Sequence, residues 1–245
     1  MQIAVLSDLH LGKKDKLDQF YRNPGAEEKL ENLFEYLESH VDKIILLGDV
    51  FETLRGKSLK NREKQLKDIL KCYPKITQRI LEDPAYVLLQ GNHDTISGPV
   101  LNAREALKIK DNGVSMCFFH GHQVDPKVGS FWIRHFEKTG VWLGGWLERA
   151  GFDVTKKGNL SSKLKALNGL WKKGLFEEAA VAYGKEMGGD IIITGHSHHP
   201  MKIEIDGALF LNSGTRVAGR QDFALLDTAT REYEVYKAFD SSSQN

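Results

Sequence analysis

The segment Lys43–Glu52, KIILLGDVFE, is a run of branched aliphatic residues that ends abruptly in glycine and aspartate. Continuous apolar runs of this length are typical of strands that are buried on both faces. Four other segments repeat the pattern: IAVLSDLH (3–10), AYVLLQGNHD (85–94), SMCFFHGH (115–122) and DIIITGHSH (190–198). Stretches with helical spacing, at 26–40 and around 60–82, separate the first three runs, so the front half predicts a βαβαβ arrangement of class α/β.

The rest of the chain has two different sequence patterns. After residue 198 short alternating segments and quick turns predict antiparallel hairpins, which we expect to form a second, mostly antiparallel sheet at the C-terminus. Residues 124–188 contain all four tryptophans and several helical-looking segments, and 127–185 hold 11 Lys or Arg against 5 Asp or Glu. We therefore predict a core of 1–123 and 189–239, an inserted helical cap at 124–188 and a frayed tail at 240–245.

The overall composition indicates a globular protein without a strong net electrostatic field. The chain has 245 residues, of which 41% are hydrophobic, and its 34 Lys or Arg almost balance 33 Asp or Glu. Such a balance argues against a global attraction to nucleic acid, although the basic cap leaves a local one open. Isolated Cys72 and Cys117 suit a reducing compartment. We find no basic leader and no run of about 18 apolar residues, so we expect a cytoplasmic protein that touches membranes only peripherally, through the cap.

Polar residues follow every apolar run, at the strand end where open α/β sheets bind ligands. The set comprises Asp8, His10, Asp49, Asn92, His93, His120, His196 and His198. Carboxylates, an amide oxygen and many imidazoles suit Mn²⁺, Fe²⁺ or Zn²⁺ better than Ca²⁺. There are more ligands than one ion needs, so we predict two divalent ions that share a carboxylate. Extended backbone would point both members of the 8/10 and 196/198 pairs to one side.

In this order along the chain, DLH, GDVFE, GNHD, HGH and GHSHHP resemble the signature of the calcineurin-like metallophosphoesterase superfamily. The resemblance implies a two-sheet β-sandwich flanked by helices, an α/β/β/α fold, here with an inserted helical cap. It also implies a hydrolase with a dinuclear centre, for which we expect Mn²⁺ first and Fe²⁺ or Zn²⁺ as alternatives. By this resemblance, the first metal is held by Asp8, His10 and His198, the second by Asn92, His120 and His196, and Asp49 bridges them.

Residues beside these ligands complete the expected site. We expect His93 to protonate the leaving oxygen or stabilise its charge, and Asp94 to fix the tautomer of His93. His122 has the same i, i+2 relation to His120, and the resemblance places it near the site rather than on a metal. His199 should point away from its neighbours, toward a loop or the substrate. We interpret the charged run 60–68 as a solvated helix face.

The place of the cap refines the resemblance. With a helical cap between the HGH and GHSH blocks, the chain is similar to bacterial UDP-diacylglucosamine diphosphatases. These are pyrophosphatases of lipid A biosynthesis, which release UMP and a lipid phosphate. The similarity implies a lipid-linked nucleotide substrate, with contacts from Asn159, Ser162 and Lys163. Tryptophans beside Arg and Lys in 130–152 suit either a small helical core or a lid at lipid headgroups.

Other functions stay open at this point. His93 stands where that branch has arginine, and histidine here is commoner in general phosphodiesterases and phosphatases. The basic cap keeps a nuclease among the alternatives. A binding scaffold that has lost catalysis is a further alternative, but such a protein would be expected to lose ligands or His93.

Overall fold

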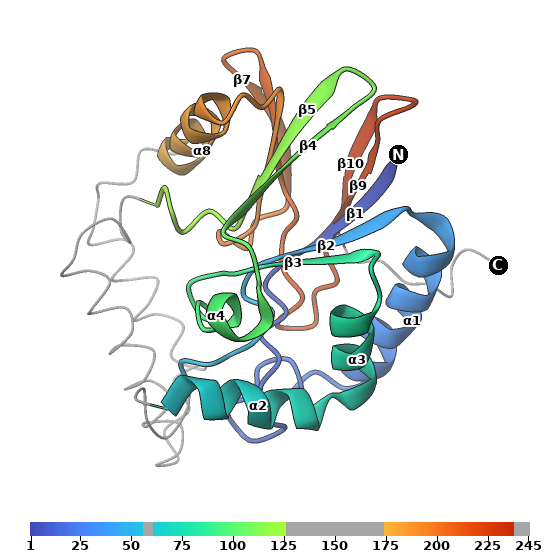
Figure 1. The fold of residues 1–245 in the computed structure, drawn as a ribbon, viewed down its shortest axis with the longest axis vertical. Coiled ribbons are helices and arrows are strands. Elements are labelled where there is room, and N and C mark those ends of the chain that lie inside the picture. Colours follow the sequence, from blue (N-terminus) through green and yellow to red (C-terminus); the bar gives the residue numbers. More distant parts are fainter. Residues whose placement is uncertain (56–60, 126–173, 238–245) are drawn as a thin grey trace.

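The computed structural model describes residues 1–55, 61–125 and 174–237 (Figure 1). The predicted cap at 124–188 therefore lies mostly outside the described residues, together with all four tryptophans and the expected contacts Asn159, Ser162 and Lys163. The predicted tail at 240–245 lies outside them as well. Among the described helices, none is long and apolar enough to cross a membrane.

The first sheet has the strand order β10-β9-β1-β2-β3. Its strands are β1 (Gln2–Leu6), β2 (Lys43–Leu47), β3 (Tyr86–Leu89), β9 (Phe223–Asp227) and β10 (Glu232–Tyr236). The three apolar runs of the front half pair in parallel, so β1, β2 and β3 all end at one edge, as the sequence predicts. Strands β9 and β10 extend this sheet as an antiparallel hairpin beside β1.

The second sheet has the order β4-β5-β6-β8-β7. Its strands are β4 (Ala106–Asp111), β5 (Val114–Phe119), β6 (Ile191–Thr194), β7 (Met201–Ile205) and β8 (Ala208–Asn212). Strands β5, β6 and β8 are parallel, while β4 and β7 pair antiparallel at the two edges. The expectation of a second sheet built from C-terminal hairpins is therefore wrong. That sheet is centred on two of the five apolar runs, and only the first of the C-terminal hairpins joins it.

Apolar side chains alternate between the two faces of each central strand, which builds three layers of core. Between the sheets, Ile3 and Val5 of β1 and Ile45 of β2 meet Phe118 of β5 and Ile193 of β6. The helices are α1 (Ala26–His40), α2 (Arg62–Cys72), α3 (Pro74–Glu82), α4 (Ser97–Leu101) and α8 (Leu175–Glu186). Helices α1, α2 and α3 cover the outer face of the first sheet (Figure 1). The expected α/β/β/α sandwich is confirmed.

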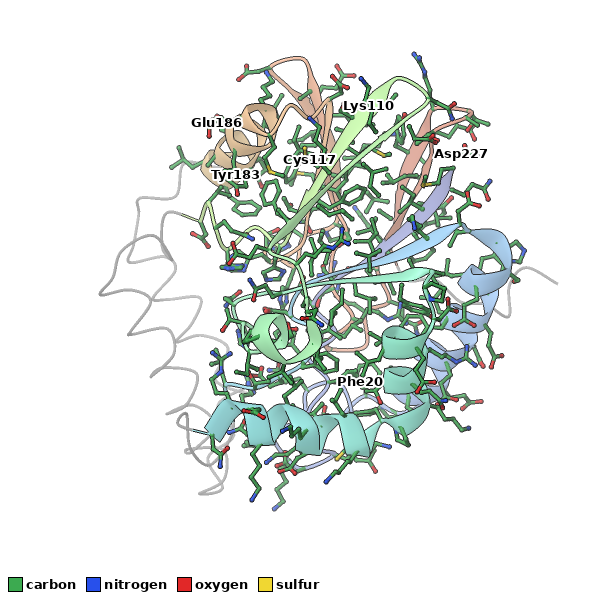
Figure 2. All side chains as sticks on the ribbon, in the orientation of Figure 1. Phe20, Lys110, Cys117, Tyr183, Glu186 and Asp227 are labelled. Atoms are coloured by element: carbon green, nitrogen blue, oxygen red, sulfur yellow. The ribbon has the colours of Figure 1, made fainter. Side chains whose placement is uncertain are left out.

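Helix α8 covers the outer face of the second sheet, although the sequence analysis assigned its residues to the cap. Phe176, Ala180 and Val181 pack on Ile192 and on neighbouring side chains of this sheet. The ring of Tyr183, which Figure 2 labels on α8, lies edge-on to the ring of Phe119, and the two ring centroids are 5.0 Å apart. The helix thus closes the sandwich beside the strand that carries the GHSHHP block.

Close contact between α8 and β6 depends on the absence of a side chain at Gly184. A Cβ atom there would lie 2.2 Å from Cγ1 of Ile192, which is fully buried. We expect Gly184→Ala to reduce the free energy of unfolding by about 1 to 2 kcal/mol, because overpacking outweighs the gain of about 1 kcal/mol in helix propensity. Ala182→Ser adds one atom at an exposed position of the same helix and should change stability by less than about 0.5 kcal/mol. Urea unfolding measures both, and an equal or more stable Gly184→Ala protein would contradict the packing.

Candidate metal centre

The polar residues that follow five strands of two different sheets converge on one site. Asp8 and His10 follow β1, Asp49 follows β2, Asn92 follows β3, His120 follows β5, and His196 and His198 follow β6. Potential ligand atoms form three groups, and within each group the atoms all lie within 4.8 Å of one another. They are Asp8 with His10 and His198, Asp8 with Asp49 and His120, and His10 with Asp49 and His93. The first group has the same members as the predicted ligands of the first metal.

Asp49 lies between the two halves of the site, as a bridging carboxylate requires. Its Oδ2 atom is 3.3 Å from Nε2 of His120 on one side and 3.8 Å from Nε2 of His10 on the other. Oδ1 of Asn92 lies 3.2 Å from Nε2 of His120, and the ring of His196 lies 5.2 Å from the His120 ring. The structure therefore brings together the residues that the resemblance assigns to each metal.

Five of these residues have a left-handed backbone. The φ angles are 54° at Asp8, 50° at His10, 51° at Asp49, 65° at His196 and 58° at His198. Non-glycine residues rarely occupy this region, and such strain clusters at functional sites. The expected extended geometry of the two i, i+2 pairs is therefore wrong. Each pair converges because the chain turns sharply at both of its members.

Two glycines allow these turns to lie close together. A Cβ atom on Gly91 would lie 2.1 Å from Oδ1 of Asp49, and one on Gly195 would lie 2.4 Å from Oγ of Ser7. Any side chain at either position would separate the strand ends. The glycines of the GNHD and GHSHHP blocks thus set the spacing of the site.

Asp94 supports the site in a different way from the one expected. Its buried carboxylate accepts hydrogen bonds from the backbone N–H groups of Gly91, Val50 and Phe51, at 2.6, 2.9 and 3.2 Å. Among the described residues, Asp94 makes no hydrogen bond or ion pair with the ring of His93. The expectation that Asp94 fixes the tautomer of His93 is therefore wrong: Asp94 joins the loops after β2 and β3.

Glu52 is the carboxylate that contacts the His93 ring, and the sequence analysis missed it. Its Oε2 atom lies 2.9 Å from Nδ1 of His93 and 3.3 Å from Nδ1 of His10. Its other oxygen accepts from the backbone N–H groups of Leu54 and Arg55. Burial raises the pKa of Glu52, but the charges and hydrogen bonds of His93 and His10 together outweigh burial and leave the pKa well below its usual range. The final glutamate of GDVFE, three residues after Asp49, was the available signal.

Arg62 was also missed, because its segment was interpreted as a solvated helix face. Its Nη2 atom donates to the carbonyl of His93 at 2.9 Å and to Oγ1 of Thr53 at the same distance. Its Nη1 atom donates to Oγ1 of Thr95 at 2.8 Å. The first residue of α2 therefore holds the backbone of His93 in place. A single basic residue in a charged run carries no sequence signal for this inward direction.

The remaining sequence-predicted residues lie at the edge of the site. The His122 ring lies 5.5 Å from the ring of His120, whereas His199 is exposed. Nε2 of His196 lies 2.9 Å from Oδ2 of Asp125, a carboxylate that the sequence analysis did not single out. Asp125 can therefore orient the His196 ring from outside the ligand set.

The charges and donor atoms of the site fit divalent cations. Burial raises the pKa of Asp8 and of Asp49, but nearby histidines outweigh burial and leave the pKa of both carboxyls below the usual range. Nε2 of His10 is buried and has no hydrogen-bond partner among the described residues, although it lies 3.9 Å from Asp8 and 3.8 Å from Asp49. A buried imidazole nitrogen that faces two ionised carboxylates is suited to a metal ion.

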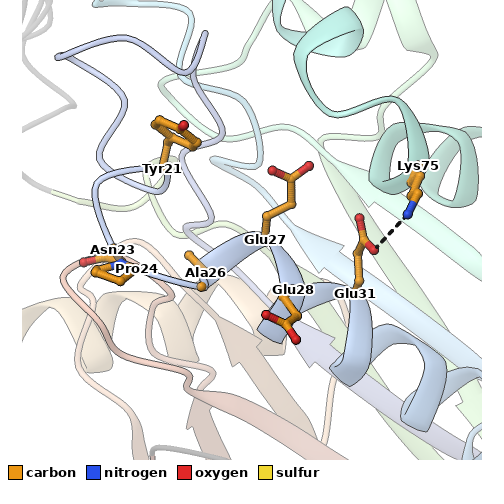
Figure 3. A pocket seen from close by; sticks show the side chains of 9 residues that line it. Tyr21, Asn23, Pro24, Ala26, Glu27, Glu28, Glu31 and Lys75 are labelled. Atoms are coloured by element: carbon orange, nitrogen blue, oxygen red, sulfur yellow. Dashed lines mark ion pairs between the residues drawn. The ribbon is translucent and has the colours of Figure 1, made fainter.

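A pocket near the start of α1 is separate from this centre. It has a volume of about 540 Å³, and its lining includes Tyr21, Glu27, Glu28 and the ion pair of Glu31 with Lys75 (Figure 3). None of the residues that line it is a candidate metal ligand. Its carboxylates give it the wrong charge for a phosphate-bearing substrate.

A two-sheet sandwich with Asp, Asn and His side chains gathered at its strand ends is the arrangement expected of a metallophosphoesterase. The family model of calcineurin-like phosphoesterases matches residues 1–200, and the chain belongs to this family. No curated protein matches the chain.

Solved structures of low sequence identity are similar to this chain. A hypothetical protein of Pyrococcus horikoshii is 11% identical, with 99% of this chain and 90% of that chain covered and a TM-score of 0.53. Vps29 of Entamoeba histolytica complexed with zinc is 19% identical, with 97% and 91% covered and a TM-score of 0.49. A conserved uncharacterized protein of Streptococcus pneumoniae, a predicted phosphoesterase, is 16% identical, with 96% and 97% covered and a TM-score of 0.43.

The position of Glu52 gives a test of the metal centre. We expect Glu52→Gln to weaken metal binding by about 10- to 100-fold, because the neutral amide no longer orients and polarises the imidazole of His10. The amide oxygen can still accept from Leu54 and Arg55, so the loop should stay folded. Calorimetric titration of metal-stripped protein with Mn²⁺ measures the change, and Glu186→Gln at an exposed end of α8 is the matched control. Equal affinity in both variants would remove Glu52 from the site.

Proposed function

We propose that the chain is a metal-dependent hydrolase of a phosphodiester or phosphoanhydride bond. The observation that carries this proposal is the position of His93 beside the ligand groups. Its backbone N–H donates to Oδ1 of Asp49 at 2.8 Å, and its ring lies edge-on to His10 with a centroid distance of 4.7 Å. A histidine that is not needed as a ligand but is fixed against two ligands is suited to proton transfer.

Divalent ions at such a site lower the pKa of a bound water and neutralise the negative oxygens of a phosphoryl group. The residues that would hold them are Asp8, His10, Asp49, Asn92, His120, His196 and His198. Manganese is the ion that we propose first, with iron or zinc as alternatives.

The chain itself supplies the acid. Burial lowers the pKa of His93, but the carboxylates of Glu52 and Asp49 outweigh burial and raise it to about 10. These two carboxylates thus favour the protonated form of the ring, which is the form that a general acid needs. Because Glu52 contacts Nδ1, Nε2 is the nitrogen from which His93 would give a proton to the leaving oxygen.

As substrate we propose a lipid-linked nucleotide pyrophosphate of the UDP-diacylglucosamine type. Support comes from the sequence: the long segment between the HGH and GHSH blocks is basic and contains all four tryptophans. Such a composition suits peripheral contact with lipid headgroups and with an anionic substrate. A cytoplasmic location beside a membrane belongs to the same proposal.

A general phosphodiesterase or phosphatase is the second candidate, and His93 itself favours it, since UDP-diacylglucosamine diphosphatases typically have an arginine at this position. A nuclease is favoured only by the basic segment. A non-catalytic metal-binding scaffold is disfavoured because all seven ligands and His93 are present.

Removal and return of metal tests the proposed function. Exhaustive chelation should reduce hydrolysis by at least about 100-fold, and Mn²⁺ should restore it, because attack at phosphorus needs an activated water. The substrate panel contains bis-p-nitrophenyl phosphate, a UDP-diacylglucosamine-type pyrophosphate and single-stranded DNA. Preference for the pyrophosphate supports the proposed substrate, and preference for either other compound supports that alternative. Full activity after chelation would contradict a metallohydrolase.

Replacement of His93 separates catalysis from metal binding. We expect His93→Ala to retain its metals and to lose about 10²- to 10⁴-fold in kcat, the usual contribution of a general acid. His40→Ala removes an exposed histidine at the end of α1 and should leave kcat unchanged. Metal analysis and steady-state kinetics of both variants are the measurements. A His93→Ala protein with normal kcat would show that another group protonates the leaving oxygen.

A further inference from the structure

A small basic pocket lies behind the metal centre, where the loop after β8 approaches the chain just before α1. Its volume is about 30 Å³, and its lining includes Phe20, Asn23, Lys29, Arg216, Arg220 and Gln221. This volume holds about two water molecules. A nucleoside or an acyl chain is too large for it, whereas a small oxyanion matches its size.

Arg216 is a buried cation with unused hydrogen-bond donors. The residue is 3% exposed, and neither Nε nor Nη1 has a hydrogen-bond partner among the described residues. Its backbone N–H donates to the carbonyl of Asp8 at 3.2 Å, which fixes the residue beside a metal ligand. A guanidinium keeps its charge at neutral pH, and a buried charge is costly unless it is paired. An anion bound beside Arg216 would accept hydrogen bonds from these free donors and pair the buried charge.

Charges around Arg216 leave a positive surplus. Arg220 donates from Nη1 to the carbonyl of His198 at 2.7 Å, and its Nη2 atom lies 2.5 Å from Oδ2 of Asp222. The same oxygen of Asp222 accepts from the backbone N–H of Thr215 at 3.2 Å. Lys29 lines the pocket from α1. Three cations thus line the pocket, and Asp222, the carboxylate that pairs with Arg220, offsets one of them, which leaves a surplus of two charges.

We propose that Arg216, Arg220 and Lys29 form a binding site for a phosphate group. Its oxygens can accept hydrogen bonds from the free N–H groups of Arg216. The group can come from two sources: free inorganic phosphate, whose dianion matches the local surplus of two charges, or the second phosphoryl group of a pyrophosphate substrate, which carries one negative charge. In the second case the site rests on the proposed function.

Thermal unfolding of the full-length chain in the presence of EDTA tests the site without any hydrolysis. Chelation prevents phosphate from binding to metal ions. Inorganic phosphate at about one hundred times its Kd should raise the Tm by about 5 °C, with chloride at equal ionic strength as reference. Arg216→Met should abolish the shift, and Arg216→Lys should keep a smaller one. Arg231→Met, in the exposed β9–β10 turn, should shift as the wild type does.

Two results of this experiment would overturn the site: no phosphate-dependent shift in the wild type, or an unchanged shift in Arg216→Met. Arg216→Lys keeps the test informative if Arg216→Met does not fold, since a shift equal to that of the wild type would also count against the guanidinium.

Kinetics of the metal-loaded enzyme distinguish the two sources. If the substrate supplies the anion, Arg216→Met should raise KM about 10-fold for a nucleotide pyrophosphate and leave KM for bis-p-nitrophenyl phosphate, which has one phosphoryl group, unchanged. If free phosphate supplies it, both KM values stay unchanged and only the phosphate-dependent Tm shift is lost. Because the unfolding experiment needs no turnover, an inactive enzyme would count against the proposed function and not against the site.

Discussion

The buried carboxylate of Asp94 is the interaction on which the site depends most. It accepts hydrogen bonds from backbone N–H groups of the loop after β2 and of the loop after β3, and so holds two neighbouring strand ends together. Burial and the charge of Asp49 raise the pKa of Asp94 to about 6, while the hydrogen bonds from Gly91 and Phe51 oppose the rise. Asp49, Asn92 and His93 all stand on the two tied loops. The hydrogen bonds of Asp94 to the backbone therefore fix the distances between these three residues without the help of a metal ion.

The sequence indicated which polar residues gather at the site, because apolar runs and the polar residues after them are local features. Which strands pair is not local. Strands such as β5 and β6 are buried on both faces, so their side chains fit either sheet equally, and the pattern does not show that they leave the first sheet. The pattern predicted a second sheet but not its strands, and the packing of two sheets into a sandwich was predicted through the family resemblance.

Side-chain direction was the second gap. Asp94 and Glu52 both follow the same kind of strand end, and only the folded loops show that one faces backbone N–H groups and the other faces two histidines. Arg62 turns inward from a charged helix for the same reason: its partners, Thr53 and Thr95, are far from it in sequence or across an intervening loop. A left-handed backbone at Asp8 or His198 likewise follows from the close approach of chain segments, and residue type alone only permits it.

The candidate ligands come from both sheets, so a metal ion at this centre would link the two sheets. Asp8, Asp49 and Asn92 belong to the first sheet, whereas His120, His196 and His198 belong to the second. The backbone N–H of His196 already donates to Oδ2 of Asp8 across the interface, at 3.0 Å. In the unfolded chain these groups are separated by up to nearly two hundred residues, so an ion that needs both sets binds the folded chain alone. The free energy of metal binding would therefore stabilise the packing of the two sheets. It would also offset the strain of the left-handed backbone at five candidate ligands, which costs on the order of 1 kcal/mol or more per residue.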